Sequence, residues 1–174
     1  MPGRSRAQAR DSFLAPLKRS LSCVTNSQLY VPETTSASGD VLGALTLSEE
    51  PLVLRSDRLG GNILLELRHQ FRYVKEREHR WHVSTVGYLY QLYDEAGQEL
   101  VSWHWHPESN AYPHLHAASG VLDKRIHLPT GRMSIESLLR MLLTDFAVHP
   151  RRDDFMEVLA KAEEPFIEHR RWHA

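Results

Sequence analysis

The sequence has little of three things: cysteine, long apolar runs and net charge. Cys23 is the only cysteine among 174 residues, which excludes an internal disulfide and a metal cluster held by several thiolates. No apolar run approaches the roughly 18–20 residues that a membrane-spanning helix needs. The formal net charge is −1, so any affinity for nucleic acid must come from a local patch. These absences predict a protein of a reducing, cytoplasmic setting that is not inserted in a membrane.

What the chain does contain is ordinary for a folded protein. Its hydrophobic fraction is 41% and its charged fraction is 25%, and its length fits one domain with a single core. Residues 1–60 are expected to be an N-terminal arm and a loop-rich segment. The first part is basic and predicts a flexible arm or a short helix, with a transit peptide as the alternative. Residues 31–60 are rich in Pro, Gly, Ser and Thr and predict loop with one strand near Pro51–Leu54.

Residues 61–174 carry the patterns of an α+β domain. The stretch NILLELRHQFRY (62–73) alternates apolar and polar residues as a half-buried strand does, and HVSTVGYLYQLY (82–93) is typical of a central strand. Turn residues after 93 predict a hairpin to ELVSWHWH (99–106), and HLHA (114–117) follows after a loop. We expect an antiparallel sheet of four to six strands.

The last third of the chain has helical periodicity. An i, i+3, i+4, i+7 apolar stripe follows Ser134, which we expect to cap the N-terminus of a helix. A second helix is expected over 150–172, with a kink or a break at Pro165 because proline cannot donate a hydrogen bond to the residue four before it. The predicted fold class is α+β, with these two C-terminal helices packed on one face of the antiparallel sheet.

Four of the eleven histidines lie in the stretch SWHWHPESNAYPHLHA, as two His-x-His pairs. Residues two apart in a strand point the same way, so His104 and His106 share a face, and so do His114 and His116. If the loop between the pairs closes a symmetric hairpin, His106 lies opposite His114 and His104 lies opposite His116. The spacing therefore predicts four imidazoles in one compact group, with the intervening tryptophans on the other face.

Other polar side chains are expected beside this group. Arg68, Arg72 and Tyr88 fall on the same predicted sheet face, where the arginines would contact the phosphate groups of a substrate. Arg132 follows a glycine just before the first C-terminal helix, so it is a further candidate phosphate contact, although a plain turn before a capped helix explains it equally well. Three histidines further along the chain are interpreted as structural or merely exposed: His127, His149 and His169.

Three interpretations of the paired histidines remain open. In the first, neutral imidazoles bind zinc or another divalent ion, although no Asp or Glu lies inside the pairs and only Glu108 lies beside them. In the second, one histidine takes the 2′-hydroxyl proton of RNA, another protonates the leaving oxygen, and an arginine stabilises the phosphorane without a metal. In the third, they are ordinary polar residues of a half-exposed strand.

Part of the chain resembles a known family. An aromatic strand, a polar hairpin strand, a loop that ends in Tyr-Pro-His-x-His (Tyr112 to His116) and an amphipathic helix together are similar to the TumE family of toxin–antitoxin toxins. The resemblance covers about residues 62–145. It departs from the family at Ser102–His106, where the family tends to carry Arg-Tyr-Asp. The resemblance implies a small bacterial toxin with an antitoxin protein as its partner.

The leading prediction joins this resemblance to the histidine pairs. It is a TumE-like toxin that acts on RNA as a ribonuclease, needing no metal or other cofactor. The four paired histidines would supply general acid and base, and the substrate would be bound by Arg68, Arg72, Tyr88 and Arg132. The alternatives are a non-enzymatic component of a protein complex and a metal-dependent hydrolase with a histidine cluster.

Overall fold

The structure is a computed structural model of the whole chain. It describes residues 2–37, 39–47, 50–78, 80–118, 122–123 and 125–168, apart from the side chains at positions 2, 110 and 111. In chain order the elements are β1 (Pro2–Gly3), α1 (Arg6–Leu21), β2 (Glu33–Thr35), β3 (Val41–Thr46), β4 (Leu52–Ser56), β5 (Gly61–Arg77), β6 (Arg80–Tyr93), β7 (Glu99–His106), β8 (Asn110–Ala117), β9 (Leu128–Pro129), α2 (Ile135–Thr144) and α3 (Phe155–Glu168).

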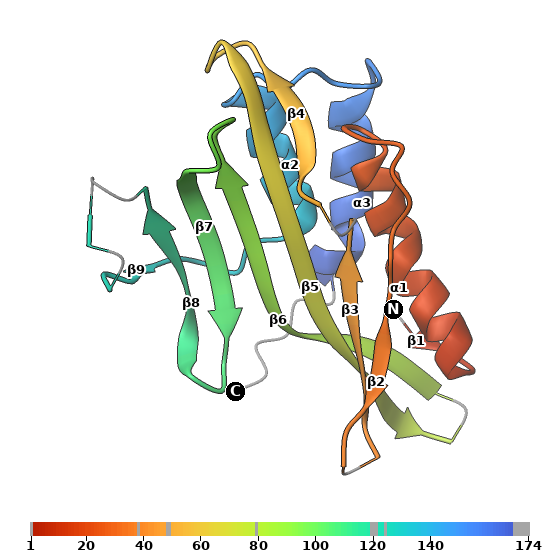
Figure 1. Cartoon of the computed structure of the whole chain (residues 1–174). Coiled ribbons are helices and arrows are strands. Elements are labelled where there is room, and N and C mark those ends of the chain that lie inside the picture. Colours follow the sequence, from red (N-terminus) through yellow and green to blue (C-terminus); the bar gives the residue numbers. More distant parts are fainter. Residues whose placement is uncertain are drawn as a thin grey trace. The chain divides into compact units, whose positions relative to one another are not determined.

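The strands form one antiparallel sheet (Figure 1). Its strand order is β2-β3-β5-β6-β7-β8-β9, with β4 also paired to β5 and β1 paired to β6. The predicted α+β class, with an antiparallel sheet and two C-terminal helices, is therefore confirmed. Over the described residues the sheet has nine strands rather than the four to six expected, because strands of two or three residues are too short to show a period.

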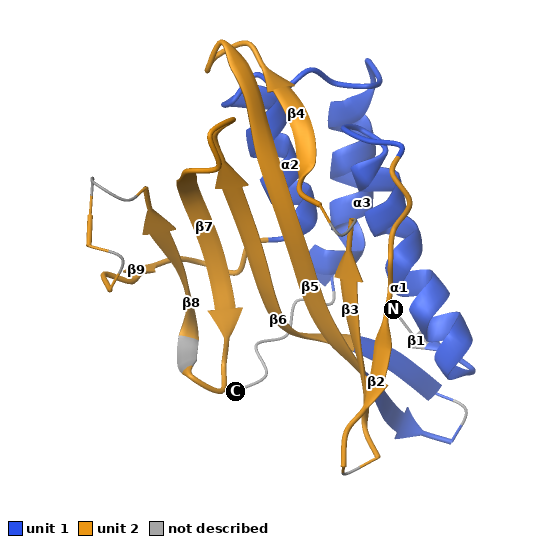
Figure 2. Ribbon diagram, in the orientation of Figure 1, with its two compact units in different colours: residues 1–26, 73–83, 134–174 blue, residues 27–72, 84–133 orange. Residues whose placement is uncertain are grey.

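The chain divides into two compact units (Figure 2). Unit 1 comprises residues 1–26, 73–83 and 134–174, and unit 2 comprises residues 27–72 and 84–133. The first 60 residues, expected to be an arm and a loop-rich segment, contribute α1 to unit 1 and β2, β3 and β4 to unit 2. The strand expected near Pro51–Leu54 is present as β4.

The basic N-terminal stretch is a helix of 16 residues, so of the two forms expected for it, a flexible arm or a short helix, the helix is found. The side chain of Ser5 caps its start by accepting a hydrogen bond from the backbone N–H of Gln8. Its apolar residues, among them Leu14 and Leu17, are buried in unit 1, where α1 packs against both α2 and α3. Charged residues and Pro16 interrupt the apolar stripe of this helix, so its periodicity does not reveal its length.

The two C-terminal helices complete unit 1. Ser134 caps α2 as predicted, because its hydroxyl accepts a hydrogen bond of 3.0 Å from the backbone N–H of Ser137. The second helix, α3, begins at Phe155 rather than at residue 150, and it contains Pro165 without ending there. The predicted end of this helix, from 169 to 172, lies outside the described residues. None of the described helices is both long and apolar enough to cross a membrane.

Strand β5 supplies much of the core of unit 2. Its predicted alternation is confirmed, since its odd-numbered residues from Ile63 to Phe71 are buried. His69 is the polar member of this row, and both of its ring nitrogens have partners: Nδ1 lies 2.6 Å from the hydroxyl of Tyr90 and Nε2 lies 2.9 Å from the hydroxyl of Thr85. Burial, with a smaller contribution from the charge of Arg132, lowers the pKa of His69 to about 3. His69 is therefore a neutral, fully bonded core residue.

Candidate metal centre

One extra residue in β7 decides which side chains share a face with the histidines. Leu92 of β6 pairs with Val101 of β7, whereas the next residue, Tyr93, pairs with Glu99. Leu100 therefore has no partner across the strand pair and forms a β-bulge. A bulge of one residue changes the register by one, which exchanges the two faces for every residue beyond it.

The bulge places Tyr88 on the face away from the histidines. Tyr88 pairs directly with Trp105 and Tyr90 pairs with Trp103, and we call these four residues the tryptophan face. The rings of Tyr88 and Trp105 are 6.1 Å apart, and the buried hydroxyl of Tyr88 accepts a hydrogen bond of 3.0 Å from the backbone N–H of Met133. The expectation that Tyr88 lies beside the histidines is therefore wrong.

The two His-x-His pairs meet in a register two residues away from the expected one. His104 lies opposite His114, and His116 lies opposite Ser102. The turn is tighter than expected, since His106 already pairs with Asn110, and β8 accommodates two additional residues before His114. Because this shift is an even number, both pairs keep a common face. The predicted pairing is wrong, and the predicted common face is confirmed.

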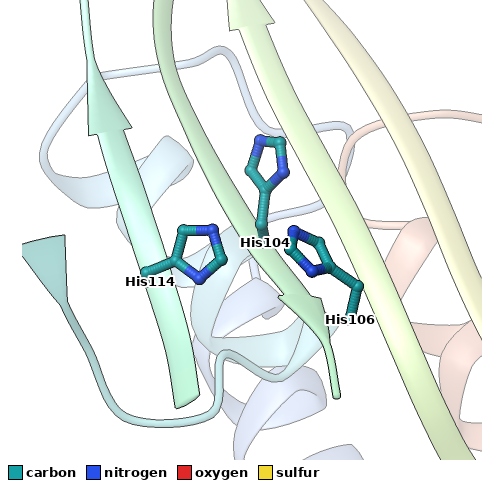
Figure 3. A group of neighbouring side chains, drawn as sticks. All are labelled: His104, His106 and His114. Atoms are coloured by element: carbon teal, nitrogen blue, oxygen red, sulfur yellow. The ribbon is translucent and has the colours of Figure 1, made fainter. Parts of the chain in front are cut away.

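Five imidazoles gather on this face. The ring centroids of His104 and His114 are 5.5 Å apart, and those of His104 and His116 are 4.9 Å apart. His106 lies 5.1 Å from His114, and Figure 3 shows these rings from β7 and β8 close together. The fifth ring is that of His127, which stacks on His114 at 4.4 Å. We call these five residues the histidine cluster.

His127 was not expected in this cluster. Its side chain is exposed, as predicted, but its ring lies 4.7 Å from that of His116 as well as against His114. It is held there because the following residues, Leu128 and Pro129, pair with β8. A strand of two residues has no periodicity, so the sequence carries no signal that would bring His127 to the paired histidines.

His114 is bonded in the way that a metal ligand is. Its Nδ1 lies 3.0 Å from the backbone carbonyl oxygen of Tyr112, and a carbonyl only accepts, so Nδ1 carries the proton. The lone pair is then on Nε2, which is buried and has no hydrogen-bond partner among the described residues. The whole residue is 2% exposed. A histidine that donates one ring N–H to a backbone carbonyl and presents the other nitrogen is the usual form of a metal-binding histidine.

His104 presents a second nitrogen of this kind. Its Nε2 is also buried and without a partner in the described part of the chain. Burial is the main cause that lowers the pKa of His104 to about 4, followed by the charges of His116, His114 and His106. Burial likewise lowers the pKa of His114. Both rings are therefore neutral at physiological pH, which is the form that binds a metal ion.

Two groups of three histidines have ligand atoms that all lie within 4.8 Å of one another: His104, His106 and His114, and His114, His116 and His127. Around a tetrahedral zinc ion, bonds of about 2.0–2.1 Å place the ligand nitrogens roughly 3.3 Å apart. Small rotations of the rings would therefore close either group on an ion. A ligand set made of imidazole alone suits zinc, copper or nickel and disfavours calcium or magnesium.

Glu99 lies on the same side of the sheet as the cluster. One of its carboxylate oxygens accepts a hydrogen bond of 2.7 Å from the hydroxyl of Ser102, which is the residue opposite His116. Its charge also acts to raise the pKa of His104, against the larger effect of burial. In a strand without the Leu100 bulge, Glu99 would point to the tryptophan face, which is why the sequence alone did not place it here.

The three arginines proposed as phosphate contacts do not lie together beside the histidine cluster. Arg68 and Arg72 are exposed on β5, and they share the histidine side of the sheet with Glu66, which accepts a hydrogen bond from Tyr93. Strand β6 lies between β5 and β7, so their backbones are about 10 Å from that of β7. Arg132 lies on the tryptophan face, with its guanidinium 4.0 Å above the ring of Trp105.

No family model, curated protein or solved structure matches this chain. The resemblance of residues 62–145 to TumE toxins stays a prediction that these comparisons leave untested.

Proposed function

We propose that this protein binds a divalent transition-metal ion through the histidine cluster. The observation that carries the proposal is the pair of buried Nε2 atoms, on His104 and His114, that lack a hydrogen-bond partner among the described residues. A buried polar atom left in this state costs about 1–3 kcal/mol, and native proteins rarely keep one. A cation placed between the rings would give both Nε2 atoms a partner.

The proposed ion has room for a reactive ligand. Three histidines fill three positions of a tetrahedral zinc ion and leave the fourth to water, which is the arrangement of catalytic rather than structural zinc sites. Such an ion lowers the pKa of its bound water and makes a hydroxide nucleophile near neutral pH. Metal-dependent hydrolysis is therefore the activity that this proposal favours.

Zinc binding tests the proposal directly. The purified full chain is expected to retain zinc through desalting and to lose it to a chelator. Replacing both His104 and His114 by alanine should weaken zinc binding at least ~100-fold, since even supporting residues behind the ligands contribute 10–100-fold. The matched control is His149→Ala, which removes an exposed histidine of unit 1 and should bind zinc as the wild type does. Equal zinc affinity in the double variant and the control would refute the proposal.

A second candidate is the metal-independent ribonuclease of a TumE-like toxin, with RNA as its substrate, an antitoxin as its partner and the cytoplasm as its location. The observation that favours it is that exposed Arg68 and Arg72 lie on the same side of the sheet as neutral imidazoles. It ranks second because a histidine with a pKa of about 4, as His104 has, is a weak base at neutral pH.

The toxin hypothesis predicts that expression of the protein slows bacterial growth. His116→Ala should restore growth while the protein stays folded, because truncating a half-buried polar residue changes stability little, whereas loss of an acid or base lowers the rate of cleavage ~10²–10⁴-fold. Growth and thermal unfolding would be measured side by side. Unimpaired growth at high expression of the wild type, or equal toxicity of the folded variant, would exclude this hypothesis.

A further inference from the structure

The histidine cluster contains one residue that both ligand groups need. His114 belongs to the group with His104 and His106 and also to the group with His116 and His127. It is the most buried of the five, at 2% exposure, and lies at their centre, with four rings between 4.4 and 5.5 Å from its own. The two groups are therefore not independent sites.

His114 can bind only one ion at a time. Its Nδ1–H is engaged with the carbonyl oxygen of Tyr112, so a single lone pair, on Nε2, remains. To bridge two ions, the ring would have to lose that proton and with it the hydrogen bond to Tyr112. The tautomer that the structure fixes thus allows one metal ion and excludes a pair that shares this residue.

The two groups share His114 and differ in their other two ligands. His104 is half-buried and stands across the strand pair from His114, and we call His104, His106 and His114 the inner group. His127 is exposed and precedes a strand of only two residues, and we call His114, His116 and His127 the outer group. The inner group also has an exposed ligand, His106, so an ion from solvent can reach either group through one exposed side chain.

We propose, as a refinement that rests on the proposed metal binding, that the cluster holds a single divalent ion, which either group can bind. His114 is a ligand in both positions, and the ion moves between them when His116 and His127 are exchanged for His104 and His106. The exchange is short, since the rings of His104 and His116 are 4.9 Å apart and those of His106 and His114 are 5.1 Å apart. The cluster is then a centre for one ion with two alternative ligand sets, rather than a two-metal site.

The test uses the full chain, zinc as the probe and a competing chromophoric chelator to report free zinc. The wild type is expected to bind one equivalent. His114→Ala removes a ligand from both groups and should weaken binding at least ~100-fold. His106→Ala and His127→Ala each leave one group intact and should still bind one equivalent.

Because His114 is buried, its alanine variant needs a check that is independent of folding. In the wild type, nitrogen NMR of the His114 ring should show Nε2 bound to zinc and Nδ1 still protonated. His114→Gln, with a polar side chain, serves as the second variant. Two equivalents in the wild type, loss of the Nδ1 proton, or loss of zinc binding in His106→Ala or His127→Ala would each overturn this inference alone. A wild type that binds no zinc would overturn the proposed function as well.

Discussion

Deleting Leu100 is expected to abolish both the native packing of β7 and zinc binding. The backbone N–H of Asp94 donates to the carbonyl of Gln98 over 2.9 Å, so the turn fixes where β7 begins. Without the bulge residue, every later residue of β7 would turn to the other face. Trp103 and Trp105, now 6% and 7% exposed, would face outward. Since loss of one buried tryptophan costs roughly 3–5 kcal/mol, we expect the free energy of unfolding to fall by more than about 4 kcal/mol.

The matched control is Leu100→Ala, which shortens a half-buried side chain but keeps the extra residue. It should bind zinc as the wild type does and unfold at a slightly lower urea concentration. Urea denaturation and zinc titration of the two variants would be compared directly. A deletion variant that folds and binds zinc as tightly as Leu100→Ala would show that the turn absorbs the deletion and that the bulge does not set the faces.

The features of this fold that the sequence predicts are those that follow from regular periodicity, which the Leu100 bulge interrupts. Alternation in β5, the cap at Ser134 and the common face of the two His-x-His pairs all follow from periods of two or 3.6 residues, which depend only on neighbours along the chain. The alternation and the cap are found as expected. The common face of the histidine pairs is predicted correctly although their pairing is not, because the expected and the observed register differ by an even number of residues.

What the sequence does not predict depends on single-residue irregularities and very short elements. The Leu100 bulge puts Tyr88 on the tryptophan face and Glu99 on the histidine side, in both cases opposite to simple alternation. Strand β9 brings in His127 although it has two residues. Arg132 is a candidate phosphate contact only from its position before a helix. In the structure its guanidinium lies over the ring of Trp105, on the tryptophan face. Each of these outcomes comes from contacts distant in sequence.

A buried carboxylate in unit 1 is expected to make stability depend on pH. Glu136, in the first turn of α2, is 2% exposed, and one of its oxygens lies 3.2 Å from the hydroxyl of Ser20 on α1. Burial is the main cause that raises its pKa to about 7, with a further increase from the charge of Glu163 on α3. Its own backbone N–H, Ser20 and Arg140 act in the opposite direction.

The sign of the dependence follows from where the proton is bound. Between about pH 4.5 and 7 the folded protein keeps a proton on Glu136 that the unfolded chain has lost, so the contribution of Glu136 to stability falls as pH rises through this window and then stays low. Glu136→Gln keeps an oxygen for Ser20 and removes the charge. At pH 8 we expect this variant to be more stable than the wild type by up to about 3 kcal/mol, taking roughly 1.4 kcal/mol for each pKa unit. Near pH 4.5 the two should be equal.

Glu163→Gln provides a control of opposite sign in the same helical unit. The carboxylate of Glu163 accepts hydrogen bonds from Ser134 and Ser137 and forms an ion pair of 2.7 Å with Arg140, and its pKa is lowered despite burial. Its charge therefore stabilises the fold above its ordinary pKa, and that stability is lost as pH falls. Urea unfolding at pH 8 should show Glu136→Gln more stable and Glu163→Gln less stable than the wild type. At pH 5 the gain of Glu136→Gln should be much smaller, whereas the loss of Glu163→Gln should persist, because its pH window lies below its ordinary pKa of 4.5. If Glu136→Gln matches the wild type at both values, the carboxylate of Glu136 is not held protonated by the fold.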